Sequence, residues 1–413
     1  MSALFAAGTS DTHTRLVHYC RLFLWEQTGL VYQKPVNTAE GMAQIESAEN
    51  VRRGFVKDRE LPWGYGSGIE DVNLLGGQLL FSLCNAWEKN GNPALADYIR
   101  KLGRGFLLIA EVSPEKGFVP RGPHPDGKSY YTDPSMDQVT AHIYALWRYY
   151  HCSLAEEKHK EIIRRRIPEV MERLIGHNWE IMREDGKTRA YVGHSWLGFE
   201  THAVISLLMG LAAAWDVSGN EKWLVLFRDL SAERWKYLDP AWEFHFSGHQ
   251  LYIYQKQYQL LTLRVILEKM HDLPHVKTVE AALAGWGEGM LASTWPQKPA
   301  DWPEDEIRQL GWKTKKVTPR EGWMLYEKKM FDPVFRQERS INNKALRIFI
   351  VTCVRFPAAN FLGACLSGDA KQQEIIFPLF NNMLKAVDFT KDIDNGDIVL
   401  LSVLYDLYCA GRI

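Results

Sequence analysis

The chain has 413 residues, 46% of them hydrophobic and 24% charged, which is the composition of a globular protein with a large core. Its 49 basic and 50 acidic residues give a formal net charge of -1, so nothing global attracts nucleic acid or an anionic membrane surface. The six cysteines form no CxxC or Cys/His cluster. We therefore expect no metal site, no disulfide framework and no cofactor.

The first residues, MSALFAAGTSDTHTR, lack the basic segment and the apolar run of a secretory signal. No run approaches the roughly 20 apolar residues that span a bilayer. The cysteines lie singly in apolar, helix-like stretches, and buried free thiols are typical of a reducing compartment. We expect a soluble, cytoplasmic protein, and the sequence sets no expectation for its oligomeric state.

Helical patterns dominate the chain, and the first predicted helix covers about residues 12–28. The clearest pattern lies at 72–112, where two helical periods and a turn form a hairpin. The NGNP turn at 90–93 ends the first helix, because its glycine suits a left-handed position and its proline opens the next helix. The apolar stripe of the first helix consists of Val72, Leu75, Leu79, Leu83 and Trp87.

Similar hairpins recur along the rest of the chain. The turns VSGNEKW (217–223) and LSGDAKQ (366–372) each separate two apolar periodic segments. Counting in this way predicts further hairpins at 137–176, 200–238, 250–292 and 342–388, and a last helix at about 397–411. If the two terminal helices pair, six hairpins close into an all-α (α/α)6 toroid, which we predict as one domain over 1–413. An open superhelix is the alternative, but it needs polar capping repeats, and the terminal helices are apolar.

A toroid places several distant loops side by side. The first helices of the hairpins run parallel in its inner ring, so the loops that lead into them meet at one mouth. Those loops are rich in acidic, basic and aromatic side chains, whereas the opposite connections, such as NGNP (90–93) and SGNEK (218–222), are short and carry no aromatics. Aromatic rings stack on pyranose faces and polar groups bind hydroxyls, so the mixture indicates a carbohydrate substrate. The candidates for substrate binding are Trp63, Tyr65, Glu70, Arg121, Tyr131, Gln138, His194, Trp196, His249, Tyr252, Arg339 and Asn342.

The acids of these loops have two interpretations each. Asp133, followed by Pro134, is typical of a helix start with a capping carboxylate, and catalysis is the alternative. Asp137 lies in or just past the first turn and is less needed as a cap, so it is our first candidate for catalysis. Glu70 and Asp71 stand together before another helix start, where we expect one to cap and the other to act.

Glu200 begins an apolar helix after the rings of HSWLGF (194–199). Such surroundings raise the pKa of a carboxyl group, as a general acid requires. Our first assignment is Asp137 as base and Glu200 as proton donor, and the exchanged roles remain open. Asp71 and Asp133 are the alternative catalytic acids.

Residues 294–341 interrupt the hairpin rhythm with tryptophans, prolines and charges of both signs. A connection of this length in a compact domain is usually a lid, a binding loop or disorder. Its four tryptophans disfavour disorder. We predict a partly ordered lid over the mouth, and the alternative is a surface excursion packed on the outer ring.

The motifs GIEDVNLLGGQLL (68–80) and DPSMDQVTAHIYALWRYY (133–150) resemble those of the six-hairpin glycosidase superfamily. Within it, the chain looks most like the unsaturated uronyl hydrolases and related hydrolases of acidic polysaccharide fragments. The resemblance implies a general acid/base Asp near the start of an inner helix, which corresponds to Asp137, or else to Asp71 or Asp133. It also implies that aromatics with Arg or His hold the sugar.

These observations predict a glycoside hydrolase that acts on a uronic-acid-containing oligosaccharide. A polysaccharide lyase or a sugar epimerase on the same fold is the alternative. Those enzymes remove a proton next to a carboxylate with His or Tyr, while Asn or Arg neutralises the acid group. The candidates for these roles are Tyr252, His249, His194, Asn342, Asn343 and Arg339. A scaffold that binds protein on a concave face would carry a smooth apolar or singly charged groove, which the mixed loops disfavour.

Overall fold

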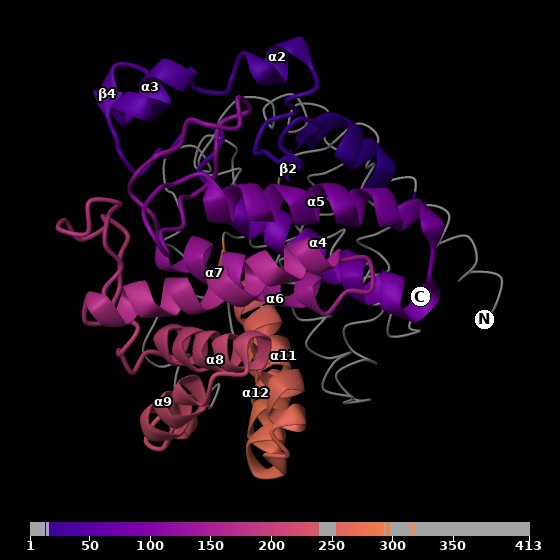
Figure 1. The fold of residues 1–413 in the computed structure, drawn as a ribbon, viewed down its shortest axis with the longest axis vertical. Coiled ribbons are helices and arrows are strands. Elements are labelled where there is room, and N and C mark those ends of the chain that lie inside the picture. Colours follow the sequence, from indigo (N-terminus) through magenta and orange to yellow (C-terminus); the bar gives the residue numbers. More distant parts are fainter. Residues whose placement is uncertain (1–12, 14–15, 239–252, 293–294, 298–314, 318–413) are drawn as a thin grey trace.

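The computed structural model describes residue 13 and residues 16–238, 253–292, 295–297 and 315–317. These residues form the predicted all-α fold (Figure 1), with three small antiparallel ribbons of two strands each. The predicted hairpin at 342–388 and the predicted helix at 397–411 lie outside the described residues. Closure of a six-hairpin ring therefore stays a prediction.

Four helical hairpins lie where the sequence predicts them. In each, the second helix packs against the first. The hairpins are α4 (Val72–Asn90) with α5 (Pro93–Glu111), α6 (Met136–Tyr150) with α7 (Glu157–Gly176), α8 (Thr201–Ser218) with α9 (Glu221–Ser231), and α11 (Ile253–Lys269) with α12 (Leu273–Ala292). A short 3-10 helix, η1 (Trp235–Leu238), follows α9.

The turns within two of these hairpins use the predicted caps. Gly91 (φ +58°) ends α4 in the left-handed conformation, and Asn92 Oδ1 accepts a backbone N–H of the first turn of α5 at 3.1 Å. Gly219 (φ +65°) and Asn220 take the same places between α8 and α9. Such caps satisfy backbone groups that a helix end leaves unpaired, so these boundaries are encoded locally.

The first helices of the four hairpins run parallel. Side-chain contacts join their early turns to early turns and their late turns to late turns. The pairs are Leu74 with Gln138 and Asn85 with Arg148 (α4 and α6), Thr140 with Ser206 and Trp147 with Asp216 (α6 and α8), and Ser206 with Gln259 and Asp216 with Lys269 (α8 and α11). The loops before these helices therefore belong to one end of the molecule, as an inner ring requires.

Asp216 joins the C-terminal ends of α6, α8 and α11. Its carboxylate accepts hydrogen bonds from Trp147 Nε1 at 2.7 Å and Lys269 Nζ at 3.0 Å, and it lies 2.6 Å from His151 Nε2. Burial alone would raise the pKa of Asp216, but these partners, His151 first, hold it below its usual range. This clamp fixes the end of the helices opposite the long loops.

Helix α8 lies deep in the core, packed against α6, α7, α9 and α11. Ala212, Ala213 and Ala214 are completely buried. Among the described residues, α8 is the one helix long and apolar enough to cross a membrane by length and composition, and 78% of it is buried inside the fold. That burial is what a core helix shows.

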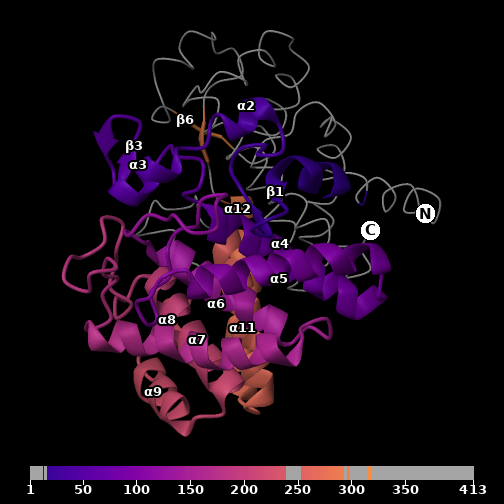
Figure 2. The same cartoon turned by 45° about the horizontal axis from the view of Figure 1, so that its top comes forward.

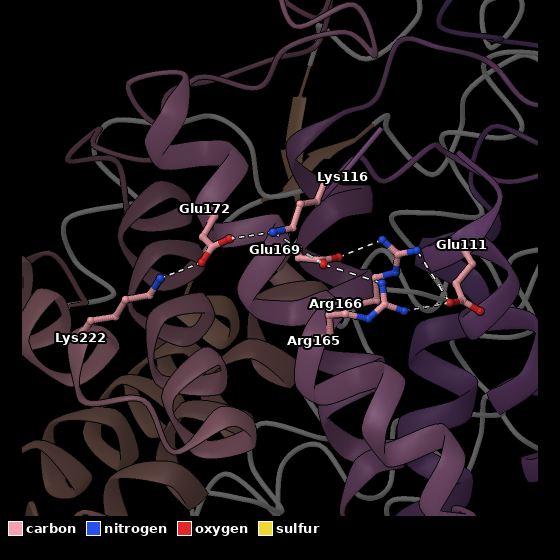
Figure 3. Close-up of polar contacts among 7 residues, drawn as sticks. All are labelled: Glu111, Lys116, Arg165, Arg166, Glu169, Glu172 and Lys222. Atoms are coloured by element: carbon pink, nitrogen blue, oxygen red, sulfur yellow. Dashed lines mark hydrogen bonds and ion pairs between the residues drawn. The ribbon is translucent and has the colours of Figure 1, made fainter. Parts of the chain in front are cut away.

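A chain of ion pairs links the outer helices α5, α7 and α9 (Figure 3). Arg166 and Glu169 of α7 pair at 2.8 Å, and Arg166 also lies 3.7 Å from Glu111 at the end of α5. Further along α7, Glu172 pairs with Lys222 of α9 at 2.7 Å. The Glu169 side chain is 7% exposed, so its pairing with Arg166 compensates a carboxylate taken out of water.

The N-terminal segment lies beside the hairpins in both views (Figures 1 and 2) and combines short helices with two ribbons. Residues 16–23 are helical, so the helix predicted at 12–28 ends earlier, where the chain enters the first ribbon. The elements are β1 (Leu24–Trp25), β2 (Leu30–Val31), α2 (Ala39–Met42), α3 (Ala48–Arg53), β3 (Phe55–Val56) and β4 (Arg59–Glu60). Strand β1 pairs with β2, and β3 pairs with β4.

Gly29, in the turn between β1 and β2, brings the first ribbon against α5. Its φ of +69° is in the left-handed region, and an added Cβ would collide with the carbonyl oxygen of Lys101. Gly105, one turn further along α5, would likewise collide with Gly29. Two glycines therefore permit a backbone-to-backbone contact that anchors the N-terminal segment.

Candidate functional site

The loops that lead into α4, α6 and α8 meet, as the sequence predicts. Asn73, in the first turn of α4, donates its side-chain amide to the carbonyl oxygens of Pro120 at 2.7 Å and Arg121 at 2.8 Å. Ser135, just before α6, forms an isolated parallel bridge with Val192 of the loop before α8. Three segments far apart in the sequence thus share one end of the parallel helices.

Two carboxylates of this region, Asp71 and Asp137, are held by one residue, Gln138. Gln138 Nε2 donates to Asp71 Oδ1 at 3.1 Å, and the Gln138 backbone N–H donates to Asp137 Oδ1 at 2.9 Å. Gln33 Nε2 donates to the other Asp71 oxygen at 2.5 Å, and the Ser135 hydroxyl donates to Asp137. All four hydrogen bonds are donated to the carboxylates, so both are fixed in position by the protein. Asp71 and Asp137 are both partly exposed, so a ligand can reach them.

Arg121 lies beneath the ring of Tyr65. Its Cζ is 4.9 Å from the ring centroid, and its Nε donates to the Asp133 carbonyl oxygen at 3.0 Å. Arg121 is 1% exposed, and within the described part of the chain its Nη2 has no hydrogen-bond partner. A buried guanidinium N–H without an acceptor carries a desolvation penalty that an anionic ligand group would relieve.

Tyr65 links Arg121 to the two carboxylates. Burial raises the pKa of Tyr65, the positive charge of Arg121 lowers it, and the negative charges of Asp137 and Asp71 raise it, with a raised pKa as the result. The phenol therefore keeps its proton at neutral pH and acts as a donor. The residue is 45% exposed and lies between Gly64 (φ +70°) and Gly66 (φ +89°).

Trp63 and Tyr191 stack on one another from two different loops. Their ring centroids are 3.9 Å apart and their planes differ by 12°. Tyr191 is 64% exposed, and its backbone N–H donates to Asp133 Oδ1 at 3.0 Å. The sequence pattern singles out Trp63 and passes over Tyr191, because nothing in the YVGHSW segment distinguishes a ring at the surface from one in the core.

Asp133 is a structural carboxylate, so its predicted roles as helix cap and as catalytic acid are wrong. It is completely buried, and its Oδ2 accepts a hydrogen bond from Arg183 Nε at 2.6 Å. Helix α6 begins at Met136 after Ser135, two residues later than an Asp133 cap requires. The carboxylate instead joins Arg183 and Tyr191 to the loop before α6.

Glu70 organises the loop that carries Tyr65, and its predicted contact with substrate is wrong. Its carboxylate accepts the backbone N–H groups of Gly66 and Gly68, both at 2.8 Å, and the Ser67 hydroxyl at 3.2 Å. Glu70 is 7% exposed, so its oxygens are committed to the protein.

Asp71 occupies the N-cap position of α4 without a side-chain capping bond. Of the two neighbouring acids, Glu70 therefore shapes the loop. The Asp71 carboxylate instead accepts hydrogen bonds from Gln33 and Gln138 in the candidate site.

Tyr131, Trp196 and Gln138 were expected to touch substrate, but all three are completely buried. The Tyr131 hydroxyl donates to the Phe55 carbonyl oxygen at 2.8 Å, and the Trp196 ring packs beside Gly210 of α8. Substrate contact is therefore wrong for the two rings, because neither face reaches solvent. Gln138 acts on the carboxylates instead of on a ligand.

Glu200 and His194 are exposed on the loop before α8. Glu200 occupies the N-cap position of α8 without a side-chain capping bond. In the part of the chain that the structure describes, no hydrogen bond or ion pair joins Glu200 to Asp71 or Asp137. Glu200 is exposed, so the ring-lined surroundings expected for it are wrong, and its proton-donor role stays a prediction, as does the role of His194.

The remaining candidates His249, Tyr252, Arg339 and Asn342 lie outside the described residues. Of the predicted lid at 294–341, the structure describes one ribbon, in which β5 (Trp295–Gln297) pairs antiparallel with β6 (Lys315–Val317). Within the described ranges, no group of three or more His, Cys, Asp or Glu side chains is arranged to hold a metal ion. The groups that converge are two carboxylates, a phenol and a guanidinium, which suit acid–base chemistry.

A comparison with models of protein families finds no match, and a comparison with curated proteins finds none. Among solved structures, the chain is similar to the crystal structure of a sugar epimerase from a ruminal bacterium. The sequence identity is 13% and the TM-score is 0.43, over 76% of this chain and 75% of that chain. A TM-score this low identifies no shared fold, so function has to be inferred from the site.

Proposed function

We propose that this protein is an enzyme that acts on a carbohydrate, with Asp137 and Asp71 as its catalytic carboxylates. The observation that carries the proposal is the convergence of both on Gln138, although 67 residues separate Asp71 from Gln138 in the sequence. Exposed rings on the same loops, Tyr65 and Tyr191, suit the apolar faces of sugars. The motif resemblance to unsaturated uronyl hydrolases implies Asp137, or else Asp71 or Asp133, as the general acid/base.

The reaction that we favour is hydrolysis of a glycosidic bond. Asp137 takes a proton from water, whose oxygen bonds to the anomeric carbon as the bond to the leaving oxygen breaks. The negative charge of Asp71 stabilises the positive charge that develops on the sugar ring. The leaving oxygen needs a proton, and we assign its donation to the Tyr65 phenol, which keeps its proton at neutral pH.

The substrate class follows from Arg121. A uronic-acid carboxylate would give its unpartnered Nη2 an acceptor and a counter-charge, and charge-assisted bonds of this kind are among the stronger ones in proteins. Tyr65 lies over the guanidinium, so a ligand reaches Arg121 past this ring. The glycines on both sides of Tyr65 leave its backbone free to adjust.

A lyase or epimerase reaction is the second candidate, and the pairing of Tyr65 with Arg121 favours it. In such a reaction Arg121 neutralises the sugar carboxylate, and a base removes the proton from the neighbouring carbon. The Tyr65 phenol then donates its proton to the leaving oxygen in a lyase or to the carbon in an epimerase. A lyase then expels the leaving oxygen and leaves a C=C bond. An epimerase returns the proton to the opposite face.

One experiment tests the function and separates these reactions. The protein is incubated with saturated and unsaturated uronide disaccharides in heavy water, and ultraviolet absorbance and the NMR spectrum are followed. Hydrolysis releases reducing ends without absorbance from a saturated substrate, a lyase creates absorbance, and an epimerase introduces deuterium beside the carboxylate.

Asp137→Asn should lower turnover by about 10²- to 10⁴-fold, the usual range for a lost acid–base group. Asp229→Asn, a change at an exposed position of α9, is the matched control and should keep full activity. An Asp137→Asn protein that remains fully active would refute the assignment.

A further inference from the structure

The Trp63–Tyr191 pair presents one aromatic face to solvent. One face of the Tyr191 ring lies on Trp63 at a centroid distance of 3.9 Å. Tyr191 is nevertheless 64% exposed, the highest exposure among the large hydrophobic residues of the described chain. The free face of this ring offers apolar surface that a ligand can cover, and such burial is favourable because it removes apolar surface from water.

This ring is held in place from both sides. The Tyr191 backbone N–H donates to both oxygens of the buried Asp133, at 3.0 and 3.3 Å, and Asp133 is itself fixed by Arg183. The stacked Trp63 limits rotation of the side chain. A ring that is already ordered loses little entropy when a ligand stacks on it.

Short stretches of backbone connect the pair to the carboxylates. Val192, the neighbour of Tyr191, pairs with Ser135, and the Ser135 hydroxyl donates to Asp137. On the other side, Trp63 is two residues from Tyr65, which interacts with Asp71 and Asp137. The backbone therefore connects the exposed ring to the proposed reaction centre within a few residues along both loops.

We propose that Tyr191, backed by Trp63, is a stacking platform for a second sugar unit of the substrate. The inference rests on the proposed function and extends it, because it makes the preferred substrate an oligosaccharide rather than a monosaccharide. The unit that reacts lies at Asp137 and Asp71, and the next unit along the chain lies on the Tyr191 ring. A flat ring stacked against the apolar face of a pyranose discriminates chain length more than it discriminates charge.

The test measures binding by calorimetry in the Asp137→Asn background, so that ligands are not consumed. The ligands are glucuronate, a disaccharide and a tetrasaccharide that contain it, and the matched glucose, cellobiose and cellotetraose. Tyr191→Ala should weaken tetrasaccharide binding about 3- to 10-fold, which corresponds to aromatic contacts worth roughly 0.5–1.5 kcal/mol. The loss for the monosaccharide should be smaller. Tyr191→Phe keeps the ring and should bind like the parent.

Leu273→Ala is the control for loss of an exposed apolar side chain. Leu273 is 62% exposed at the start of α12, away from the loops, and its removal should leave binding unchanged. Circular dichroism checks that each variant is folded. Equal tetrasaccharide binding by the parent and by Tyr191→Ala overturns the platform and leaves the proposed function intact. If the parent binds none of the six sugars, the proposed function and the platform both fall.

Discussion

Gln138 donates its side-chain amide to Asp71 at 3.1 Å, across the junction between the starts of α4 and α6. The same residue offers its backbone N–H to Asp137 at 2.9 Å and accepts the Leu74 backbone N–H at 3.2 Å. The distance between the two carboxylates is thus set by the packing of two helices. Gln138 is completely buried, so its amide holds the distance between the carboxylates more firmly than a freely rotating surface side chain would.

Replacement of Gln138 by leucine should lower kcat by about 10- to 100-fold, because loss of the shared donor lets Asp71 move and small displacements of reacting groups are costly. KM should change less. A double-mutant cycle separates this role from general destabilisation: in an Asp71→Asn background, Gln138→Leu should cost little further activity. Fully additive losses would show that Gln138 acts independently of Asp71.

Gln78 provides a matched control for that variant. Gln78, on α4, is completely buried like Gln138, but among the described residues neither polar atom of its side chain has a hydrogen-bond partner. Gln78→Leu should therefore be neutral or stabilising, since an unpartnered buried amide is replaced by an apolar group of similar size. Thermal unfolding of both variants provides the comparison.

Arg121→Gln should weaken binding of an acidic disaccharide by about 10- to 100-fold, the loss expected for hydrogen bonds to a charged group worth roughly 1.5–3 kcal/mol. Binding of the neutral disaccharide should change much less. Titration calorimetry at two salt concentrations measures both. An equal loss for acidic and neutral ligands would mean that Arg121 only supports the loop.

Asp133→Asn should destabilise the fold by about 1.5–3 kcal/mol, because it removes a charged hydrogen-bond acceptor from Arg183 in a buried position. Urea unfolding measures the difference. The double variant Asp133→Asn/Arg183→Met should lose less than the sum of the two single changes, since each single change leaves a partner behind. A stable Asp133→Asn protein without activity would instead revive a catalytic role.

The Asp216 clamp should make stability depend on acid pH. The folded protein holds the pKa of Asp216 below its usual range, whereas an unfolded chain has the ordinary value of about 3.9. The stabilisation is therefore complete above that value and is lost as the pH falls through the lower, folded pKa. Asp216→Asn should be less stable at neutral pH, and its free energy of unfolding should fall less steeply below about pH 4. Urea unfolding at pH 7 and at pH 3 measures the slopes, and identical slopes would contradict the prediction.

The described hairpins were predictable because their boundaries are local. Gly91 and Asn92 terminate and start helices through bonds to residues within one turn, and the apolar periods between caps are long. The start of α6 was less predictable. The Asp133–Pro134 pair has the local form of a helix start, yet Arg183 and Tyr191 bind Asp133 from distant positions.

Only some of the acids and rings that the sequence singles out come together in the candidate site. Asp71, Asp137, Arg121 and Tyr65 lie in the loops that composition singles out, and the parallel helices bring them together. Sequence composition does not distinguish Trp196, which is buried, from Tyr191, which is exposed. That difference arises from tertiary packing alone.

Gln33 was not anticipated, because it belongs to a segment outside the hairpins. It follows β2, and the ribbon that carries it is fixed on α5 by the contact of Gly29 with Lys101 and Gly105. Shortening the chain to its first recognisable hairpin would consequently delete one of the two side-chain amides bound to Asp71. The stretch ahead of α4 is thus an integral piece of the proposed reaction centre. A trimmed chain that begins at residue 60 would keep the residues of the four described hairpins but would lack one hydrogen-bond donor to the Asp71 carboxylate.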